Sequence, residues 1–492
     1  MTKRMACIVF LFCAATISSA AQTYTTLHIF EDSDGATPEG LTQTTNGSLY
    51  GTTETGGDLT QCFGSGCGTV FRITTGGTLT TLDNFEPAQG EYPIGLPIVQ
   101  AANGDLYGTL AEGGASTGLC LYGYGCGAIY KITPDGALTV VYSFCSQSNC
   151  ADGGNPTALI QATDGSFYST AGSGGANCIA SGGCGTFFKI TPDGTLTTLY
   201  SFCSLSDCTD GSDPGAVIQA FDGNFYGTTD SGGAYNHGTV FKITPAGVLT
   251  TLHSFCQQSS CPDGYIPGAL IQATNGDFYG STYAGGAASG GTVFSITPTG
   301  ALITVHSFDG TDGSFPFSTP LQGSDGNFYG TTSYDSIGGG GTIYKLTPGG
   351  ALTTLHSFCF HLICATAGSF PYGLVQDTNG DFYGSTERGG NGTGVGPYCS
   401  NGCGTIYSFS IGLKPFVKTQ LASGRVGASV TILGTNLTGA TGVSFNGTEA
   451  SITANSASEI KTTVPTGATT GFVTVTTPSG TLTSNAPFRV IP

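Results

Sequence analysis

The segment FYGSTYAGGAASGGTVFSITPTGALITVHSF, residues 278–308, contains the pattern that decides the fold. It combines a strand around Phe-Tyr-Gly-Ser-Thr, a glycine-rich loop, a Gly-Thr-Val-Phe strand, a Thr-Pro-x-Gly turn and a last strand ending His-Ser-Phe. The chain repeats this pattern seven times, with marker tyrosines at Tyr50, Tyr107, Tyr168, Tyr226, Tyr279, Tyr329 and Tyr383. These tyrosines lie 50 to 61 residues apart, a period typical of propellers and solenoids.

Each copy of the repeat is expected to hold four short strands. Glycine accounts for 81 of 492 residues and charged residues for only 9%, which indicates an all-β chain with many turns. In the fifth copy the expected strands are 248–255, 268–273, 277–281 and 291–296. Short turns with glycine at the position that needs a positive φ separate them, so the strands should form an antiparallel meander.

The order of the strands predicts a closed ring. The array begins with a Leu-Thr-Thr-Leu type of strand near Thr25 and ends with the Gly-Thr-Ile-Tyr strand at 404–407. The first strand must therefore complete the last sheet, and closure removes exposed sheet edges. The sequence predicts a seven-bladed β-propeller of four-stranded blades over residues 22–411, with an open solenoid as the alternative.

The N-terminus has the features of a secretory signal peptide. Two basic residues, an apolar run over 5–17 and small residues at 18–21 predict cleavage after residue 21. Cys13 raises the alternative of a lipoprotein, but the bulky Phe12 precedes it where a small residue is expected. No later apolar run is long enough to span a bilayer. We expect a secreted, periplasmic or extracellular protein.

Sixteen cysteines follow the signal peptide, and they fall into eight local pairs. The pairs are Cys62/Cys67, Cys120/Cys126, Cys145/Cys150, Cys178/Cys184, Cys203/Cys208, Cys256/Cys261, Cys359/Cys364 and Cys399/Cys403. An even count of close pairs in an exported chain predicts disulfides. Zinc is the alternative, but it usually requires Cys-x-x-Cys spacing and four converging ligands.

The repeats resemble a known family. Copies of Phe-Tyr-Gly-Thr-Thr, Gly-Gly and Gly-Thr-Val-Phe-Lys-Ile-Thr-Pro-x-Gly across residues 24–410 are similar to the GloVer-type tandem repeat of exported bacterial proteins. The resemblance implies a secreted or cell-surface β-propeller without a shared enzymatic activity, so it transfers no catalytic residues. Some members carry a C-terminal sorting signal, whereas residues 488–492 lack an apolar anchor and a basic tail.

Residues 412–492 are expected to form a second module. Tyrosines and cysteines stop, basic residues outnumber acidic ones, and alternating strands are expected at 429–434, 442–447 and 471–476. The Gly-x-x-Val-x-Ile-x-Gly-x-Asn-Leu, Val-x-Phe-Asn-Gly and closing Phe-x-Val elements resemble the IPT/TIG immunoglobulin-like domain. That resemblance implies a spacer or adhesive module.

The repeat region is strongly acidic, with 29 acidic and six basic residues. Such a surface repels phosphate backbones and anionic lipid, so nucleic acid is excluded as a partner class. The acidity could favour cations or neutral sugars, or it could serve only solubility. We expect a monomer that binds a glycan or an envelope protein, with no cofactor and no metal.

Candidate ligand-binding residues lie in the long loops, which should share one face of the ring and surround the channel mouth. Two blades depart from the repeat there, and Asp-Gly-x-x-Pro motifs recur. The candidates are His237, Tyr334, Asp335, Asp152, Asp210, Asp263 and Asp312. For the aspartates, calcium binding and Asx-turn formation both remain open. The repeated tyrosines could form a carbohydrate platform or pack between blades.

The sequence therefore predicts an exported, noncatalytic binding protein. The alternative is a secreted lyase or hydrolase that acts on polysaccharide at the channel mouth. Histidines at one repeated position, such as His253 and His306, favour packing or hydrogen bonding over catalysis, and no catalytic residue is assigned. The two readings differ in symmetry, because catalysis requires one blade to break the pattern with converging groups.

Overall fold

The computed structural model describes residues 22–93, 97–115, 125–178, 184–316, 318–335, 339–359, 367–390, 399 and 402–491. The predicted signal peptide, Cys120 and Cys364 lie outside these residues. The described chain is all-β with short 3-10 turns and no α-helix, which confirms the predicted class. No helix in these ranges is both long and apolar enough to cross a bilayer.

Residues 23–410 form seven antiparallel sheets among the described residues, numbered here in chain order. Sheet 1 contains β2 (Ala36–Pro38), β3 (Thr42–Gln43), β4 (Leu49–Thr55), β5 (Thr69–Ile73) and β6 (Leu79–Asn84). Sheet 2 contains β7 (Val99–Gln100), β8 (Leu106–Leu110), β9 (Ala128–Ile132) and β10 (Leu138–Ser143). Sheet 3 contains β11 (Gly154–Pro156), β12 (Ile160–Gln161), β13 (Phe167–Ser173), β14 (Thr186–Ile190) and β15 (Leu196–Ser201).

Sheets 4 to 7 repeat this order. Sheet 4 contains β16 (Ser212–Pro214), β17 (Ile218–Gln219), β18 (Phe225–Ser231), β19 (Thr239–Ile243) and β20 (Leu249–Ser254). Sheet 5 contains β21 (Tyr265–Gln272), β22 (Phe278–Ala284), β23 (Thr292–Ile296) and β24 (Leu302–Ser307). Sheet 6 contains β25 (Leu321–Gln322), β26 (Phe328–Thr332), β27 (Gly339–Leu346) and β28 (Leu352–Cys359). Sheet 7 contains β29 (Ser369–Gln376), β30 (Phe382–Arg388), β31 (Thr405–Ser410) and β1 (Thr23–Ile29).

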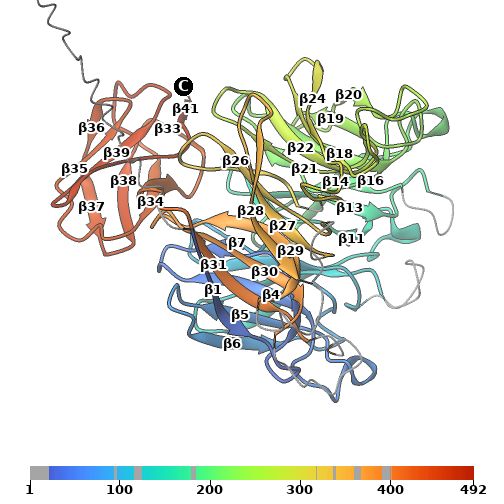
Figure 1. Ribbon diagram of the computed structural model, residues 1–492, viewed down its shortest axis with the longest axis horizontal. Helices are drawn as coiled ribbons and strands as arrows, with labels where there is room; N and C mark the ends of the chain where they lie inside the picture. The colour runs from blue at the N-terminus through green and yellow to red at the C-terminus, as the bar shows by residue number, and fades with distance from the viewer. Residues whose placement is uncertain are drawn as a thin grey trace, which may run out of the picture.

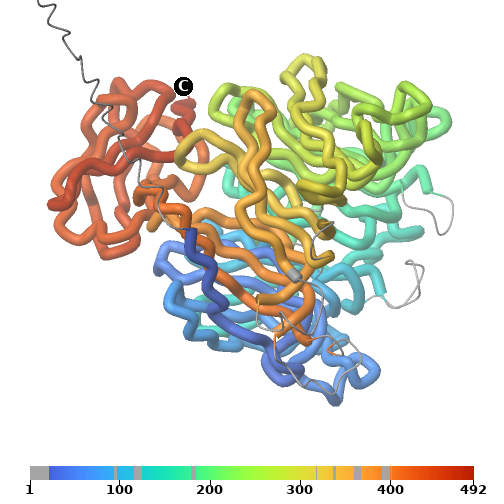
Figure 2. Tube along the Cα trace, viewed as in Figure 1, coloured from blue at the N-terminus to red at the C-terminus, as the bar shows by residue number. Residues whose placement is uncertain are grey.

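The N-terminal strand closes the arrangement. β1 pairs antiparallel with β31, with Thr23 opposite Ser410 and Ile29 opposite Thr405 (Figure 1). The colours follow one another around the molecule from blue through green and yellow to orange, and orange returns beside blue (Figure 2). The fold is therefore propeller-like, and the edge of the last sheet is covered by the start of the chain.

The first strand of each sheet differs in detail from the prediction. In sheets 1, 3 and 4 it is split into two short pieces, whereas in sheet 5 β21 is continuous with an irregularity between Pro267 and Leu270. A proline ends the first piece in each split strand, at Pro38, Pro156 and Pro214. Proline has no N–H to donate and weakens the ladder here, and the irregularity of β21 follows the equivalent Pro267.

A ring of glutamines joins neighbouring sheets at their short turns. Gln100 Oε1 accepts the Thr45 N–H of sheet 1 at 2.9 Å, and Gln272 Oε1 accepts the Phe221 N–H of sheet 4 at 2.8 Å. The equivalent bonds are made by Gln161, Gln219, Gln322 and Gln376. Gln43 Nε2 closes the ring by donating to Thr378 Oγ1 of sheet 7 at 2.9 Å. A glutamine side chain thus links each sheet to its neighbour.

Stacked aromatic rings form much of the packing between sheets. Tyr226 is fully buried and its ring centroid lies 4.1 Å from that of Phe278 in the next sheet. The pairs Tyr107/Phe167, Tyr168/Phe225, Tyr279/Phe328 and Tyr329/Phe382 repeat this contact. The repeated tyrosines therefore pack between sheets, and their burial rules out a carbohydrate platform.

The described part of the C-terminal module, residues 412–491, has two four-stranded antiparallel sheets and a short parallel pair. One sheet contains β32 (Val417–Thr419), β34 (Ser429–Gly434), β38 (Glu459–Thr463) and β37 (Ile452–Asn455). The other contains β36 (Thr448–Ala450), β35 (Gly442–Phe445), β39 (Val473–Thr477) and β40 (Gly480–Thr483). β33 (Ser423–Arg425) pairs with β41 (Arg489–Ile491). One apolar core, including Ile432, Phe445 and Val475, joins both sheets.

The C-terminal module docks on the short turns of the ring. Gln420 Nε2 donates to the carbonyls of Gln100 and Ala101, at 3.0 and 2.8 Å. Ser458 Oγ donates to the Thr45 carbonyl at 2.7 Å. Burial lowers the pKa of Lys418 to about 8, and the negative charge of Asp377 partly opposes this. The face that carries the short turns, called here the short-turn face, is therefore partly covered by the chain itself (Figure 1).

Candidate functional site

The opposite face carries the long loops and is called here the long-loop face. On it, each sheet has a non-glycine residue with a φ between 54 and 56°. This residue stands directly before a proline that recurs in all seven repeats. These residues are Thr37, Tyr92, Asn155, Asp213, Ile266, Phe315 and Phe370. A positive φ is costly for residues other than glycine, and such strain concentrates at functional sites. The sequence analysis did not single out these residues.

The positive-φ side chains lie against the end of the second strand in the preceding sheet. Asn155 Nδ2 donates to the Ala111 carbonyl at 2.9 Å, and a Cβ on Gly172 would lie 2.7 Å from Asp213 Oδ1. The Phe315 ring lies 5.1 Å from the Tyr283 ring. The same backbone geometry thus places seven side chains of six kinds around one rim, called here the mouth.

One arc of the mouth is aromatic. The Phe370 ring lies 5.2 Å from the Tyr334 ring, which in turn lies 5.8 Å from Phe315. Phe315 and Tyr334 come from sheet 6 and Phe370 from sheet 7, and Tyr283 of sheet 5 packs on Phe315. Tyr334 remains 44% exposed, so one large aromatic surface of this arc faces solvent.

The aromatic arc contains a pocket of about 260 Å³. It is lined by Tyr283, Ser333, Tyr334, Phe370, Pro371, Tyr372, Glu387 and Arg388. The Arg388 guanidinium lies 5.2 Å from the centre of the Phe370 ring, and its Nε donates to Glu387 Oε1 at 3.0 Å. The pocket thus combines aromatic walls with one paired cation and carboxylate.

The adjacent arc of the mouth is acidic. Burial first, and then the negative charges of Glu387 and Glu112, raise the pKa of Glu54. Burial also raises the pKa of Tyr372, with further contributions from Glu39, Glu387 and Glu54. These effects show that carboxylates from sheets 1, 2 and 7 lie close enough to act on one another and on the pocket wall.

A second acidic pair lies in sheet 4. Burial and the charge of Asp213 raise the pKa of Asp230 to about 7. Asp230 lies near the end of β18, at the position that Glu54 and Glu387 occupy in β4 and β30. The carboxylates of the mouth therefore recur at equivalent positions, but only in some sheets.

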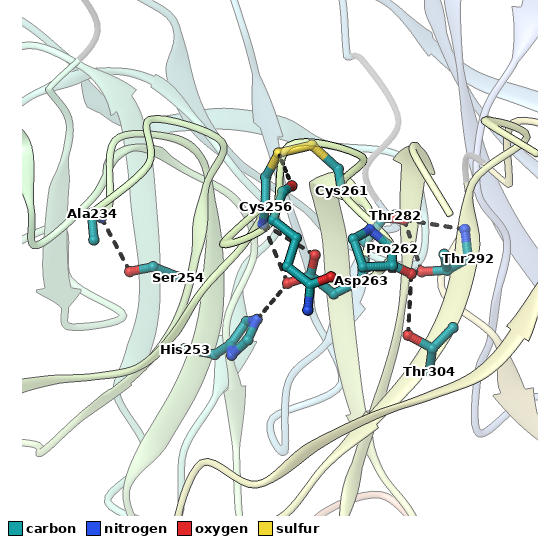
Figure 3. A network of polar contacts seen from close by, with 11 residues as sticks. Ala234, His253, Ser254, Cys256, Cys261, Pro262, Asp263, Thr282, Thr292 and Thr304 are labelled. Carbon is teal, nitrogen blue, oxygen red and sulfur yellow. Dashed lines mark hydrogen bonds and ion pairs between the residues drawn. A yellow bond between two sulfur atoms is a disulfide. The ribbon is translucent and has the colours of Figure 1, made fainter. Parts of the chain in front are cut away.

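The aspartates of the Asp-Gly motifs turn into their own loops. Asp152 and Asp210 are fully buried and accept the hydroxyls of Tyr142 and Tyr200, at 2.8 and 2.7 Å. Asp263 accepts from His253 Nε2 at 2.9 Å and from the Cys256 backbone N–H (Figure 3). These carboxylates tie each loop to its outer strand.

The same bond occurs in two further sheets. Asp312 lies 2.7 Å from His306 Nε2, and Asp34 lies 2.9 Å from His28 Nε2. Three of the four repeated histidines thus have the hydrogen-bonding role favoured from the sequence, whereas His356 at the same position stacks on Tyr24. Because the aspartates serve the loop backbone and the outer strand, any contribution to ligand binding is an indirect one through the shape of the loops.

Six of the predicted disulfides are confirmed. They join Cys62 to Cys67, Cys145 to Cys150, Cys178 to Cys184, Cys203 to Cys208, Cys256 to Cys261 and Cys399 to Cys403. Two predicted pairs, Cys120/Cys126 and Cys359/Cys364, each include a residue outside the described ranges. Glu91, Asp32 and His237 each lie near bridged sulfurs, which provide no thiolate for a metal.

Of the three remaining candidate ligand-binding residues, one lines the pocket and two do not. Tyr334 lines the pocket, and Asp335 next to it accepts the Gly339 N–H at 2.6 Å. His237 lies in the loop between β18 and β19, with its ring 5.4 Å from that of Tyr265 in sheet 5, and it is not among the pocket residues. The pocket therefore includes one predicted residue, Tyr334, together with side chains that the sequence analysis missed.

Comparisons with known proteins agree on the repeat and the fold. The family model for the Gloeobacter/Verrucomicrobia repeat matches residues 13–180, 121–265, 155–396 and 256–460. No curated protein matches the chain in sequence. A fungal alcohol oxidase of the AA5 family, in complex with copper, is 11% identical with a TM-score of 0.50, over 96% of this chain and 100% of that chain.

A second solved structure is regucalcin, a calcium-binding protein from Agrobacterium tumefaciens. It is 13% identical with a TM-score of 0.37, over 63% of this chain and 86% of that chain. A luciferin-regenerating enzyme is 10% identical with a TM-score of 0.40, over 80% of this chain and 98% of that chain. At 11% identity, the similarity to the alcohol oxidase concerns the fold and not the chemistry.

Proposed function

Because this chain belongs to the Gloeobacter/Verrucomicrobia repeat family, we propose that residues 22–411 form a seven-bladed β-propeller that binds a ligand at its long-loop face. The seven sheets and the pairing of β1 with β31 support the blade count. The ring of glutamines supports closure, because it links the last sheet to the first. The protein acts in this proposal as an exported, noncatalytic binding protein.

Export is supported by the disulfides. Six bridges within the described residues suit an oxidising compartment such as the periplasm or the cell exterior. They also hold the long loops in shape. Such rigid loops reduce the ordering cost of binding, which favours a preformed site at the mouth.

The C-terminal module, residues 412–492, is assigned in this proposal to the IPT/TIG immunoglobulin-like domains. Two four-stranded sheets around one apolar core support the assignment. Its contacts with Thr45, Gln100 and Ala101 suit a fixed spacer that leaves the long-loop face open.

The ligand proposed for the mouth is a glycan. The observation that carries this proposal is the pocket between sheets 5, 6 and 7, whose walls include Tyr334 and Phe370. Sugar rings present C–H faces that pack on aromatic rings, while their hydroxyls pair with polar groups at the pocket edge. Glu387 and Ser333 provide such groups.

The experiment is a panel of cell-envelope and plant polysaccharides offered to the purified mature protein, with retention and released soluble sugar measured together. Retention without release supports a noncatalytic binding protein. An absence of retention across the panel, in a protein that unfolds cooperatively, contradicts glycan binding and leaves an envelope protein as the partner to test.

A polysaccharide lyase or hydrolase is the second candidate. Glu54 favours it, because its pKa is raised by burial and by Glu387 and Glu112 beside the pocket. A carboxyl group with a raised pKa is better suited to act as a general acid. Release of sugar that is lost in Glu54→Gln supports the enzyme, whereas release that continues unchanged in Glu54→Gln excludes this role for Glu54.

A further inference from the structure

We propose that the pocket at the mouth selects glycans without negative charge, such as neutral chains and chains of amino sugars. This inference rests on the proposed glycan binding and names the class of ligand. It follows from the charges around the pocket rather than from its aromatic walls, which would accept any sugar ring.

The fixed charges near the pocket are mostly carboxylates. Glu387 lines the pocket itself, and burial, followed by the charges of Glu39, Glu387 and Glu54, raises the pKa of the pocket-lining Tyr372. Partly buried charges are screened less by salt than exposed ones. An anionic sugar entering the pocket would therefore meet a negative field.

Arg388 is the cation among the pocket-lining residues, and it is already engaged. Its Nε donates to Glu387, and its guanidinium packs on the Phe370 ring. Recognition of an acidic sugar usually relies on an arginine that pairs with the carboxylate of the ligand. Here the charge of Arg388 is already partly neutralised by a carboxylate of the protein.

A sugar without negative charge is not repelled by the carboxylates and does not need to pair with Arg388. It can pack on the aromatic arc and use Glu387 as an acceptor for its hydroxyls. An amino sugar adds a favourable interaction between its ammonium group and the carboxylates. The expected order of affinity is amino sugar, then neutral sugar, then acidic sugar.

The test uses the full mature protein and three oligosaccharides of equal length: chitosan, cellulose and polygalacturonate fragments. Calorimetric titration should give an affinity for the acidic oligosaccharide at least about tenfold below that of the better of the other two. This ratio should shrink as salt rises from 0.05 to 0.5 M, because the discrimination is electrostatic.

A variant pair locates the effect. Glu387→Gln releases Arg388 and removes one carboxylate, so it should reduce the discrimination against polygalacturonate by threefold or more. Asp207→Asn removes an exposed acid in the β15 to β16 loop, outside the pocket, and should leave the ratio unchanged. Thermal unfolding of both variants establishes that they are folded.

The outcomes separate the two proposals. Equal or tighter binding of polygalacturonate overturns the charge selection and leaves glycan binding intact. Binding of none of the three oligosaccharides overturns both. Discrimination that persists unchanged in Glu387→Gln and at high salt assigns the selectivity to shape and overturns the electrostatic account.

Discussion

The two faces of the ring are built from the same repeat but have opposite character. On the short-turn face the same glutamine recurs in every sheet, and the C-terminal module covers part of the surface. On the long-loop face the backbone repeats, with a φ between 54 and 56° in every sheet, while the side chains differ. Side chains are uniform on the face where glutamines join the sheets and varied on the face where we propose that a ligand binds.

This comparison of the two faces predicts different roles for the tyrosines that recur in every repeat and for those that occur in only one. Tyr226→Ala removes a fully buried ring that stacks on Phe278, and it should lower the free energy of unfolding by about 3–5 kcal/mol. Tyr334→Ala, at the mouth, should change stability by less than about 1 kcal/mol. Chemical denaturation measures both, and a similar loss in the two variants contradicts the division.

The buried loop aspartates should matter for stability more than exposed acids of the same loop. Asp210→Ala leaves the Tyr200 hydroxyl and the Ser204 and Leu205 N–H groups without their acceptor. We expect a loss of about 2 kcal/mol from this change.

Asp207→Asn is the matched control in that loop and should stay within about 0.5 kcal/mol. Both values come from denaturation curves at neutral pH. If Asp210→Ala is as stable as the control, the carboxylate does not hold the loop.

The acidic pair of sheet 4 should make stability depend on pH. The pKa of Asp230 is raised to about 7 in the fold, so the folded state binds a proton that the unfolded state releases above about pH 4. Stability contributed by this group is therefore present at low pH and is lost as the pH rises toward 7.

Asp230→Asn should raise the free energy of unfolding by roughly 1–2 kcal/mol at pH 8 and leave it nearly unchanged at pH 4. Thermal unfolding across this range measures the difference. A variant that is stabilised equally at both pH values contradicts the titration of Asp230.

A single glutamine of the ring should have a smaller effect. Gln272→Ala removes the acceptor of the Phe221 N–H and should cost about 1 kcal/mol. Hydrogen exchange at the Phe221 amide should accelerate, while exchange at the Thr274 amide, bonded to Gln322, should not. Unchanged exchange at Phe221 would show that this link does not hold the two sheets together.

The strands and the closure by β1 could be predicted because they follow from local patterns that recur. The hydropathy of the strands, the glycine turns and the order of strand types all appear in the sequence. The disulfides could be predicted for the same reason, since each joins cysteines four to six residues apart.

The pocket could not be predicted because it depends on contacts between sheets. Tyr283, Tyr334 and Phe370 come from three different repeats and meet only through the geometry of the ring. The sequence does show that one blade departs from the repeat pattern at Tyr334, and this difference identified one pocket residue. The recurring glutamine was also visible in the repeat, but its partner lies in another sheet, as with Gln272 and Phe221.

The central claim is that the aromatic arc of the mouth binds a glycan. Two tyrosines of similar exposure test it: Tyr334, 44% exposed in the pocket, and Tyr235, 42% exposed in a loop of sheet 4. The measurement is the affinity of the mature protein and of Tyr334→Ala and Tyr235→Ala for the oligosaccharide that binds best. The account predicts a loss of about tenfold or more in Tyr334→Ala and none in Tyr235→Ala. Equal affinity in the wild type and Tyr334→Ala would contradict it.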